Sequence, residues 1–305
     1  MTHTPHPSSS LPSPPPKGGL RRGLPSHHTS SILPPSPPPR GGVRGGLPFF
    51  LLLIISTLSL PLHGQGSERN HSLLFGFGTS NILDTYLSPY SYKGIEARII
   101  YQTERPTRLW DSHISFHTQT DINADYVKNP AKNARDYAVG IRFSAAWLYN
   151  FRDIHRWHFA AGLAASAYAG GIYNDRNGNN PAQGKLDLLI DLTAQSTYRF
   201  PVKGKWWKAT YSLSIPFVGI AFSPMYGQSY YEIFSLKNYD HNVVFATPLN
   251  TPSMRHLLTL DIPLGKSSLR IGCAAHLMQA RWNRIRYHAY SLDIMIGYTK
   301  HFIAL

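Results

Sequence analysis

Residues 290–302, near the C-terminal end of the chain, read YSLDIMIGYTKHF, and this stretch decides the fold. Every second position from Tyr290 to Tyr298 is apolar or aromatic, and the positions between are small or polar except Met295. A period of two is that of an extended strand with one apolar and one polar face. Lys300 stands where its long side chain can reach lipid headgroups. The pattern is typical of a strand that crosses a bilayer between lipid and a polar lumen.

The same alternation recurs through most of the chain. Ten segments carry it: 73–78, 95–102, 110–119, 137–149, 157–167, 186–200, 207–217, 255–264, 269–277 and 290–302. Short connections near 104–108, 150–154, 201–205 and 265–267 alternate with longer ones near 80–91, 122–135, 172–184 and 223–253. Outer-membrane barrels have an even number of strands, short periplasmic turns and longer outer loops. The sequence therefore predicts an all-β, antiparallel transmembrane β-barrel that starts and ends on the periplasmic side.

The strand number depends on residues 223–253. Segments 231–236 and 243–245 have strong β-propensity and would form one more hairpin, giving twelve strands in place of ten. We favour twelve, because loops of this length are uncommon. The alternative class is a soluble exported β-sandwich, whose apolar faces would point into a core and would not form aromatic rows at two heights.

The first 46 residues have a different composition. Residues 12–25 read PSPPPKGGLRRGLP and residues 35–48 read PSPPPRGGVRGGLP, a near-copy rich in proline, glycine and arginine. Such a segment cannot bury a core, so we expect a disordered leader. It is either a basic arm for nucleic acid or translated repeat upstream of the true start. We favour the second, although Met1 is the only methionine before Met225.

Residues 47–66 predict export. A short apolar run, LPFFLLLIISTLSLPL, follows Arg40 and Arg44 and precedes Gly64 and Gly66, as in a signal peptide cleaved near those glycines. A spanning helix needs about 20 apolar residues, which this run does not reach. The β-barrel domain would then be residues 67–305, in the cell outer membrane.

Charge and cysteine content set further bounds. The chain carries 30 Lys and Arg against 16 Asp and Glu, and five of the basic residues precede position 47, so the exported part has a net charge of about 30 − 5 − 16 = +9. Anionic lipid around the barrel explains such a surplus, and we expect no nucleic-acid partner. Cys273 is the single cysteine, so an internal disulfide is impossible.

Charges of both signs lie on the predicted inward faces, among them Arg98, Arg142, Asp187 and Asp293. We interpret them as a lumen network, because buried charges must pair or hydrate. A hydrolase is the alternative, with His113, Ser115 and Asp111 as a base, nucleophile and orienter. Such a tripeptide arises often by chance, so we lean away from an enzyme.

Metal and cofactor signals are weak. Residues 175–180, DRNGNN, resemble a calcium loop, but the glycine is displaced and Leu186 stands where a bidentate Glu belongs. His113, His117, His276 and His301 are spread too widely for one metal. We expect no metal and no cofactor.

Two outer-loop blocks carry a family resemblance. Residues 80–89, SNILDTYLSP, and 223–234, SPMYGQSYYEIF, resemble the uncharacterised family catalogued as domain of unknown function 3316, found in exported proteins of Gram-negative anaerobes. The segments 179–182 and 300–302 are similar to it too, and the resemblance covers about residues 72–305. The resemblance implies that the chain is related to this family, and it implies no activity, ligand or catalytic mechanism.

The outer loops are also where we expect binding residues, since loops on a rigid scaffold often carry function. The candidates are Asp84, Tyr86, Asn180, Tyr226, Gln228, Tyr230 and Tyr231, which would form a pore mouth or receptor surface for a small polar solute. Alternatively, these loops fold inward and plug the lumen, satisfying Arg98 or Arg142. Phe302 and Tyr298 are predicted to dock onto the barrel-assembly machinery, and the barrel is expected to be a monomer in outer-membrane lipid.

Overall fold

The computed structural model of the chain describes residues 68–303, so the predicted leader and signal peptide lie outside the described part. Its strands are β1 (Glu68–Asp84), β2 (Tyr92–Pro106), β3 (Ile114–Lys128), β4 (Arg135–Asn150), β5 (Trp157–Asn174), β6 (Ala182–Val202), β7 (Lys205–Phe222), β8 (Val243–Ala246), β9 (Met254–Leu264), β10 (Ser267–Trp282) and β11 (Ile285–Ile303). One short helix, α2 (Tyr230–Phe234), lies between β7 and β8. None of the described helices is long and apolar enough to cross a membrane.

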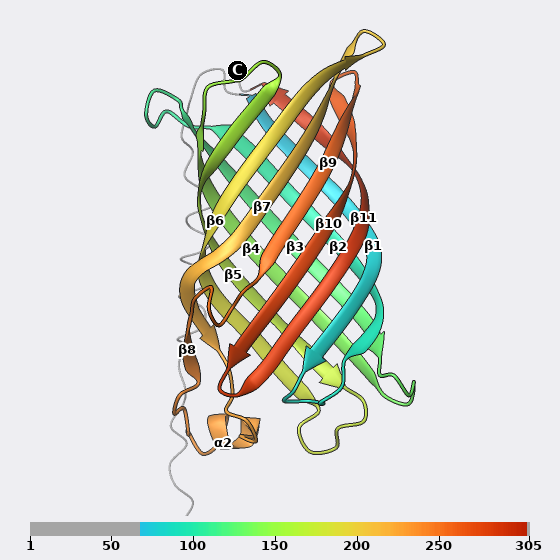
Figure 1. Cartoon of the computed structure of the whole chain (residues 1–305), viewed down its shortest axis with the longest axis vertical. Coiled ribbons are helices and arrows are strands. Elements are labelled where there is room, and N and C mark those ends of the chain that lie inside the picture. Colours follow the sequence, from blue (N-terminus) through green and yellow to red (C-terminus); the bar gives the residue numbers. More distant parts are fainter. Residues whose placement is uncertain (1–67, 304–305) are drawn as a thin grey trace, which may run out of the picture. The chain divides into compact units, whose positions relative to one another are not determined.

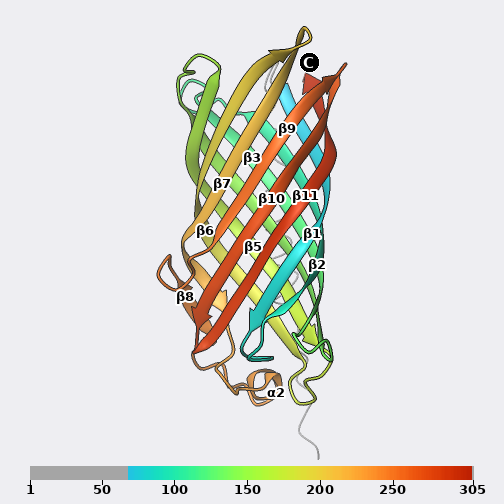
Figure 2. The same cartoon turned by 45° about the vertical axis from the view of Figure 1, so that its right-hand side comes forward.

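Ten of these strands close into a single antiparallel barrel. Neighbours in sequence pair with one another, β7 pairs with β9, and β1 pairs with β11 along its whole length. Figures 1 and 2 show the tilted strands circling back so that β1 lies beside β11. The predicted barrel is confirmed, and the alternative of a β-sandwich is wrong, because a sandwich leaves sheet edges that this pairing removes.

The extra hairpin that favoured twelve strands does not form. Ser229 caps α2 through the backbone N–H of Glu232, and the Glu232 carboxylate accepts in return from the backbone N–H of Ser229. This capping box starts a helix where β-propensity predicted a strand. β8 does form, but it pairs only with residues 219–222 of β7 and belongs to a long loop.

The connections sort into two ends of the barrel, which we name by their length. The turn end carries the connections 107–113, 151–156, 203–204 and 265–266, together with the first residues of β1 and the last of β11. The loop end carries 85–91, 129–134, 175–181, 223–253 and 283–284. Figure 1 shows α2 and β8 at one end and the C-terminus with the β6–β7 hairpin at the other. The predicted alternation is confirmed, although several strands run further toward the loop end than the sequence indicated.

The barrel presents its apolar side chains outward. On β11, Leu292, Ile294, Ile296 and Tyr298 are all exposed, whereas Asp293, Met295 and Thr299 are buried. On β5, the small residues Ala160, Ala164 and Ser166 are buried on the inward face. An apolar exterior around a polar interior reverses the arrangement of a water-soluble protein and suits lipid.

Aromatic residues form rows at two heights. Toward the loop end, Tyr126 on β3 and Tyr137 on β4 are direct neighbours whose ring centroids lie 5.5 Å apart. Toward the turn end, Phe116 and Trp147 are neighbours on the same two strands, 5.0 Å apart. Ten residues separate the rows on each strand, which is about 34 Å along a strand and about 26 Å along the axis at a tilt of about 40°. That height matches the apolar band of about 25 Å in membrane barrels.

A barrel with this closure should resist detergent until it is boiled. We expect the folded protein to migrate faster on a gel when unheated in dodecyl sulfate than after boiling, since the closed hydrogen-bonded sheet keeps its compact form. Identical mobility before and after boiling, for protein recovered from the membrane fraction, would contradict a closed barrel.

Candidate functional site

A layer of ion pairs fills the barrel interior at mid-height. The Arg98 guanidinium on β2 donates from Nε to Asp293 of β11 at 2.9 Å and from Nη1 to Asp121 of β3 at 2.6 Å. Its Nη2 atom donates to Glu96 and to the Ser291 hydroxyl. Arg98 and its three acidic partners are buried. One side chain from β2 thus binds carboxylates of its own strand, of the adjacent β3 and of β11, which lies beyond β1.

Two more arginines extend the layer. Arg142 on β4 makes a two-pronged pair with Asp187 of β6, both bonds at 2.9 Å. Its guanidinium carbon lies 4.8 Å from the centroid of the Tyr168 ring, which occupies space over Gly140 that a Cβ atom would fill. Arg255 on β9 donates to Asp191 of β6 at 2.5 Å. The predicted lumen network is therefore present in this layer, with cations and carboxylates contributed by strands around the barrel.

Arg98 and Arg142 are satisfied by carboxylates of the strands. The alternative in which the outer loops plug the lumen by satisfying these arginines is therefore wrong. Buried charges cost several kcal/mol each to desolvate, and removing one partner of such a pair typically costs about 3–5 kcal/mol. The ion pairs are consequently a structural constraint on the interior.

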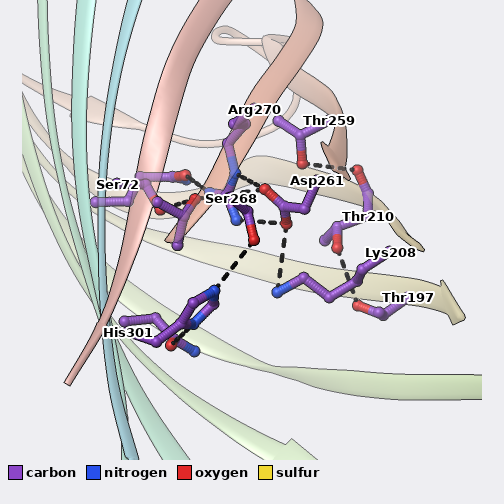
Figure 3. A network of polar contacts seen from close by, with 12 residues as sticks. Ser72, Thr197, Lys208, Thr210, Thr259, Asp261, Ser268, Arg270 and His301 are labelled. Atoms are coloured by element: carbon purple, nitrogen blue, oxygen red, sulfur yellow. Dashed lines mark hydrogen bonds and ion pairs between the residues drawn. The ribbon is translucent and has the colours of Figure 1, made fainter. Parts of the chain in front are cut away.

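On the turn-end side of this layer lies a wide polar chamber of about 170 Å³. Hydroxyl and amide side chains dominate its wall, and Arg199, Lys208, Arg255 and Arg270 supply positive charge. Figure 3 shows the network on one side of it, where Asp261 receives Arg270 through Nε at 2.6 Å and Nη2 at 2.8 Å, and Lys208 lies 3.5 Å away. The Arg270 Nη1 atom also donates to Gln102 of β2 at 3.1 Å.

Polar atoms at the inner boundary of this wide chamber lack partners. Among the described residues, neither Arg255 Nη1 nor Asp191 Oδ1 has a hydrogen-bond partner, although both atoms are buried. Arg255 lines the chamber. A buried donor and acceptor without partners each cost about 1–3 kcal/mol, so a buried water is expected to satisfy them.

A second, narrow chamber of about 70 Å³ lies on the loop-end side of the ion-pair layer. Arg98, Arg142 and His276 line it together with apolar groups such as Ile82 and Trp282. His276 also lines the wide chamber, and its Nε2 atom lies 3.5 Å from Asp121. The ion-pair layer thus divides the interior into two chambers of different size and chemistry.

A cap formed by residues 223–242 lies at the loop end. The Tyr86 hydroxyl donates to the backbone carbonyl of Gln228 at 2.8 Å, and the Tyr230 hydroxyl accepts from the backbone N–H of Gly184 at 2.6 Å. The Gln228 side chain holds the cap together, accepting from Met225 N and donating to the carbonyl of Asn238. Four of the predicted binding residues are thus brought together, since Asp84 lies beside Tyr86 and accepts from its backbone N–H at 3.0 Å.

Asp84 also binds Lys185, a residue that the sequence did not single out. The Lys185 ammonium lies 2.7 Å from Asp84 and 4.1 Å from the centroid of the Tyr287 ring. Nothing in the local sequence marks this lysine, because Asp84 is 101 positions away. Asp121 was also missed, although it alternates with Ile122 and Ala124 and a longer period-two reading would have found it.

The remaining loop candidates lie apart from this group. Tyr226 and Tyr231 are exposed on the cap, each about two-thirds accessible. The backbone N–H of Asn180 is bound at 3.3 Å by the side chain of Asn177 within the 175–181 turn. A binding role for these seven residues stays a prediction. Their geometry gives Tyr86, Gln228 and Tyr230 a part in holding the cap.

The structure does not bring the hydrolase trio together. His113 and Asp111 are exposed in the 107–113 turn, although the sequence predicted a strand over 110–119 that would include both. Nδ1 of His113 pairs with the carbonyl of Trp110 at 2.9 Å, whereas the buried Ser115 hydroxyl contacts Nε2 of His117 at 2.9 Å. Trp110, Asp111 and Ser112 all have positive φ, so the chain turns where a continued strand was expected.

Among the described residues, no three His, Cys, Asp or Glu side chains are grouped to hold a metal ion. In the 175–181 turn, Asn174 and Asn177 direct their side-chain oxygens to backbone N–H groups of residues 176–180. Such Asn-stabilised turns are common and need no ion.

The predicted assembly residues lie on the outside of β11. Phe302 packs edge-on against His71 with ring centroids 5.0 Å apart, and the Lys300 ammonium lies 4.8 Å from its ring. Tyr298 is exposed in the same outward row as Ile296 and Ile294. The row is therefore accessible along the seam with β1, and its role in docking to the assembly machinery stays a prediction.

Sequence comparison matches residues 49–305 to the family described as protein of unknown function, DUF3316. The chain belongs to this family. The match spans most of the chain and includes both outer-loop blocks that carried the resemblance. No curated protein matches the sequence.

Solved structures that resemble this member of the DUF3316 family are bacterial barrels. They include the outer membrane protease OmpT from Escherichia coli, with 10% identity, coverage of 81% of this chain and 100% of that one, and a TM-score of 0.41. The translocator domain of the autotransporter NalP from Neisseria meningitidis gives 11% identity, coverage of 83% and 95%, and a TM-score of 0.37. An outer membrane channel from Pseudomonas putida F1 gives 11% identity, coverage of 79% of this chain and 97% of that one, and a TM-score of 0.33. Because these TM-scores are below 0.5, the likeness carries no argument about function. The function of this chain must be inferred from its own residues.

The cap contacts predict a pH-dependent release. Burial, followed by the nearby Tyr230, Asp84 and Glu232, raises the pKa of Tyr86 to about 12. The docked cap therefore favours the neutral phenol, so its contribution to docking is present below about pH 10, the pKa of a free tyrosine, and is lost as the pH rises toward 12. In a phenolate absorbance titration, the difference between wild type and Tyr86→Phe should be one group titrating near pH 12.

The same variant should loosen the cap at neutral pH. Losing the hydrogen bond to Gln228 O costs about 1 kcal/mol or more, so trypsin cleavage after the exposed Lys237 should become about fivefold faster. Tyr226→Phe, on the exposed surface of the cap, serves as the control: it should leave the cleavage rate unchanged and should keep the group that titrates near pH 12. Equal cleavage rates in the two variants would show that Tyr86 does not hold the cap.

Proposed function

We propose that this chain is an outer-membrane β-barrel that is closed to through-flow at mid-height and binds a small polar solute in the wide chamber. The ion-pair layer carries the proposal, because it places buried arginine–carboxylate pairs across the lumen between two chambers. An open pore would need a continuous water path at this level, where Arg98, Asp121 and Asp293 are each at most 5% exposed.

Placement in the outer membrane is supported by the chain itself. The apolar exterior, the two aromatic rows and the even number of barrel strands are those of bacterial outer-membrane barrels. The turn end would face the periplasm, since short turns lie there in such barrels. The wide chamber would then be reached from the periplasmic side.

The chamber suits a solute rich in hydroxyl groups. Its wall presents donors and acceptors from Ser, Thr, Gln and Asn side chains, and the unpartnered Arg255 Nη1 lies at its inner boundary. Its volume resembles cavities that hold a six-membered ring. These features support a solute-binding role for the wide chamber, with the exposed loop tyrosines as a separate surface.

Conductance across planar bilayers tests the closure. The wild-type barrel should conduct little, because the layer leaves no water path. Arg98→Ser with Asp293→Ser removes one charge of each sign and shrinks both side chains, so conductance should rise. The control, Arg98→Met with Asp293→Leu, removes the same charges while keeping volume and should stay closed. A large wild-type conductance, or no rise in the serine variant while it still shows the heat-dependent gel shift, would overturn the closure.

Cysteine labelling tests access to the wide chamber. In a Cys273→Ser background, Ser212→Cys places a thiol in the wide chamber, and Ala138→Cys places one in the narrow chamber. A charged methanethiosulfonate reagent added at the turn end should label the first and spare the second. D-Glucose, as a hydroxyl-rich probe, should slow the labelling of Ser212→Cys. Equal labelling of both thiols, or labelling unaffected by the sugar, would contradict the proposed chamber.

A further inference from the structure

Three exposed cations lie side by side at the loop end of the barrel. Lys93 on β2 is the register partner of Lys128 on β3, and Lys128 is the register partner of Arg135 on β4. All three are exposed, while Tyr92, Val127 and Asp136 beside them in sequence are buried, so the three side chains point outward. Like charges on directly opposed residues of a sheet are destabilising. A row of three such charges therefore calls for a counter-charge.

Within the described residues, the protein supplies little of that counter-charge, from the Asp175 carboxylate near Arg135. No side chain of Lys93, Lys128 or Arg135 forms an ion pair within 4.0 Å of a carboxylate in the part of the chain that the structure describes. The neighbouring Asp175 directs its Oδ1 to the backbone N–H of Arg135 at 2.8 Å. The Lys128 ammonium lies 5.3 Å from the centroid of the Tyr126 ring.

The row also lies at a definite depth. The aromatic row lies two residues closer to mid-height than Lys128 and Arg135 on the same strands. In it, Tyr126 is the register partner of Tyr137, and Tyr137 is the register partner of Tyr173 on β5. Two residues advance about 7 Å along a strand, or about 5 Å along the axis at a tilt of about 40°. Each headgroup layer of a bilayer is about 5–7 Å thick. The cations thus face lipid at the level of the headgroups, just beyond aromatic rings at the edge of the hydrocarbon.

We propose that Lys93, Lys128 and Arg135 bind the phosphate group of an anionic lipid in the outer leaflet, with its acyl chains against the Tyr126–Tyr137–Tyr173 row. Adjacent strands lie about 4.8 Å apart, so three long side chains from neighbouring strands can converge on one phosphate. A phosphorylated glycolipid provides that group, because its headgroup lies at the depth of the cations. The inference rests on the proposed placement in the outer membrane.

Native mass spectrometry of the detergent-solubilised barrel with added lipid A tests the site. The variant Lys93→Gln, Lys128→Gln, Arg135→Gln removes the row. The matched control Lys203→Gln, Lys205→Gln, Lys266→Gln removes three exposed charges at the turn end. Each Lys or Arg near an anionic headgroup contributes about a four- to sixfold gain in affinity, so the row variant should bind lipid A about 100-fold more weakly than wild type. The control should bind as wild type does.

Two results would overturn the proposal. One is equal lipid A binding by the row variant and wild type. The other is full displacement of lipid A by inorganic phosphate at equal concentration, which would assign the site to free phosphate. A second measurement tests the membrane placement separately. The same proteins are inserted into phosphatidylcholine vesicles, and the heat-dependent gel shift then reports whether the barrel has formed in the membrane. A barrel that inserts normally but ignores lipid A contradicts the lipid site alone.

Discussion

The pairing of β1 with β11 is the interaction on which the rest of this structure depends. It runs from Glu68 opposite Ile303 to Asp84 opposite Tyr287, so β1 is joined to β11 along its full length. In hydrocarbon no water is present to satisfy a free strand edge, and each unsatisfied backbone group there costs several kcal/mol. Closure removes the edges and fixes which residues face lipid. The residues that face the interior are fixed at the same time, and the ion pairs inside the barrel form among them.

Closure also concentrates polar groups in a small space. Alternate residues of ten strands must point inward, and buried charges are tolerated only when they pair. Arg98, Arg142 and Arg255 meet this condition with five carboxylates from four strands. The same pairs divide the lumen, so one set of contacts both stabilises the interior and separates two chambers. The outer loops are held by their own contacts, chiefly through Tyr86 and Tyr230.

The exterior follows a different rule. Lipid requires apolar side chains over the central band, and the headgroup layers accept aromatic and cationic ones. Tyr126 and Tyr137 mark one edge of that band, and Phe116 and Trp147 mark the other. The cations beyond the first pair stand in a row because strand register aligns them. Strand register therefore brings together charges that are far apart in sequence, such as Lys93 and Arg135.

The sequence by itself determined the fold class, the strand faces and the alternation of turns and loops. These depend on a period of two and on turn residues, which are local properties that any window of ten residues reveals. It misjudged the cap, because β-propensity in residues 231–236 was outweighed by the capping box at Ser229. It also extended a strand through Trp110 and His113, where positive φ values turn the chain.

Only the tertiary structure decided which inward charges meet. Arg98 and Asp293 are 195 positions apart, and their contact exists because the barrel closes between β1 and β11. The division of the lumen, the partners of Tyr86 and the alignment of Lys93 with Lys128 and Arg135 were decided in the same way. A sequence pattern gives the face on which a side chain lies, whereas its partner depends on register and closure, which are set by the pairing of all the strands together.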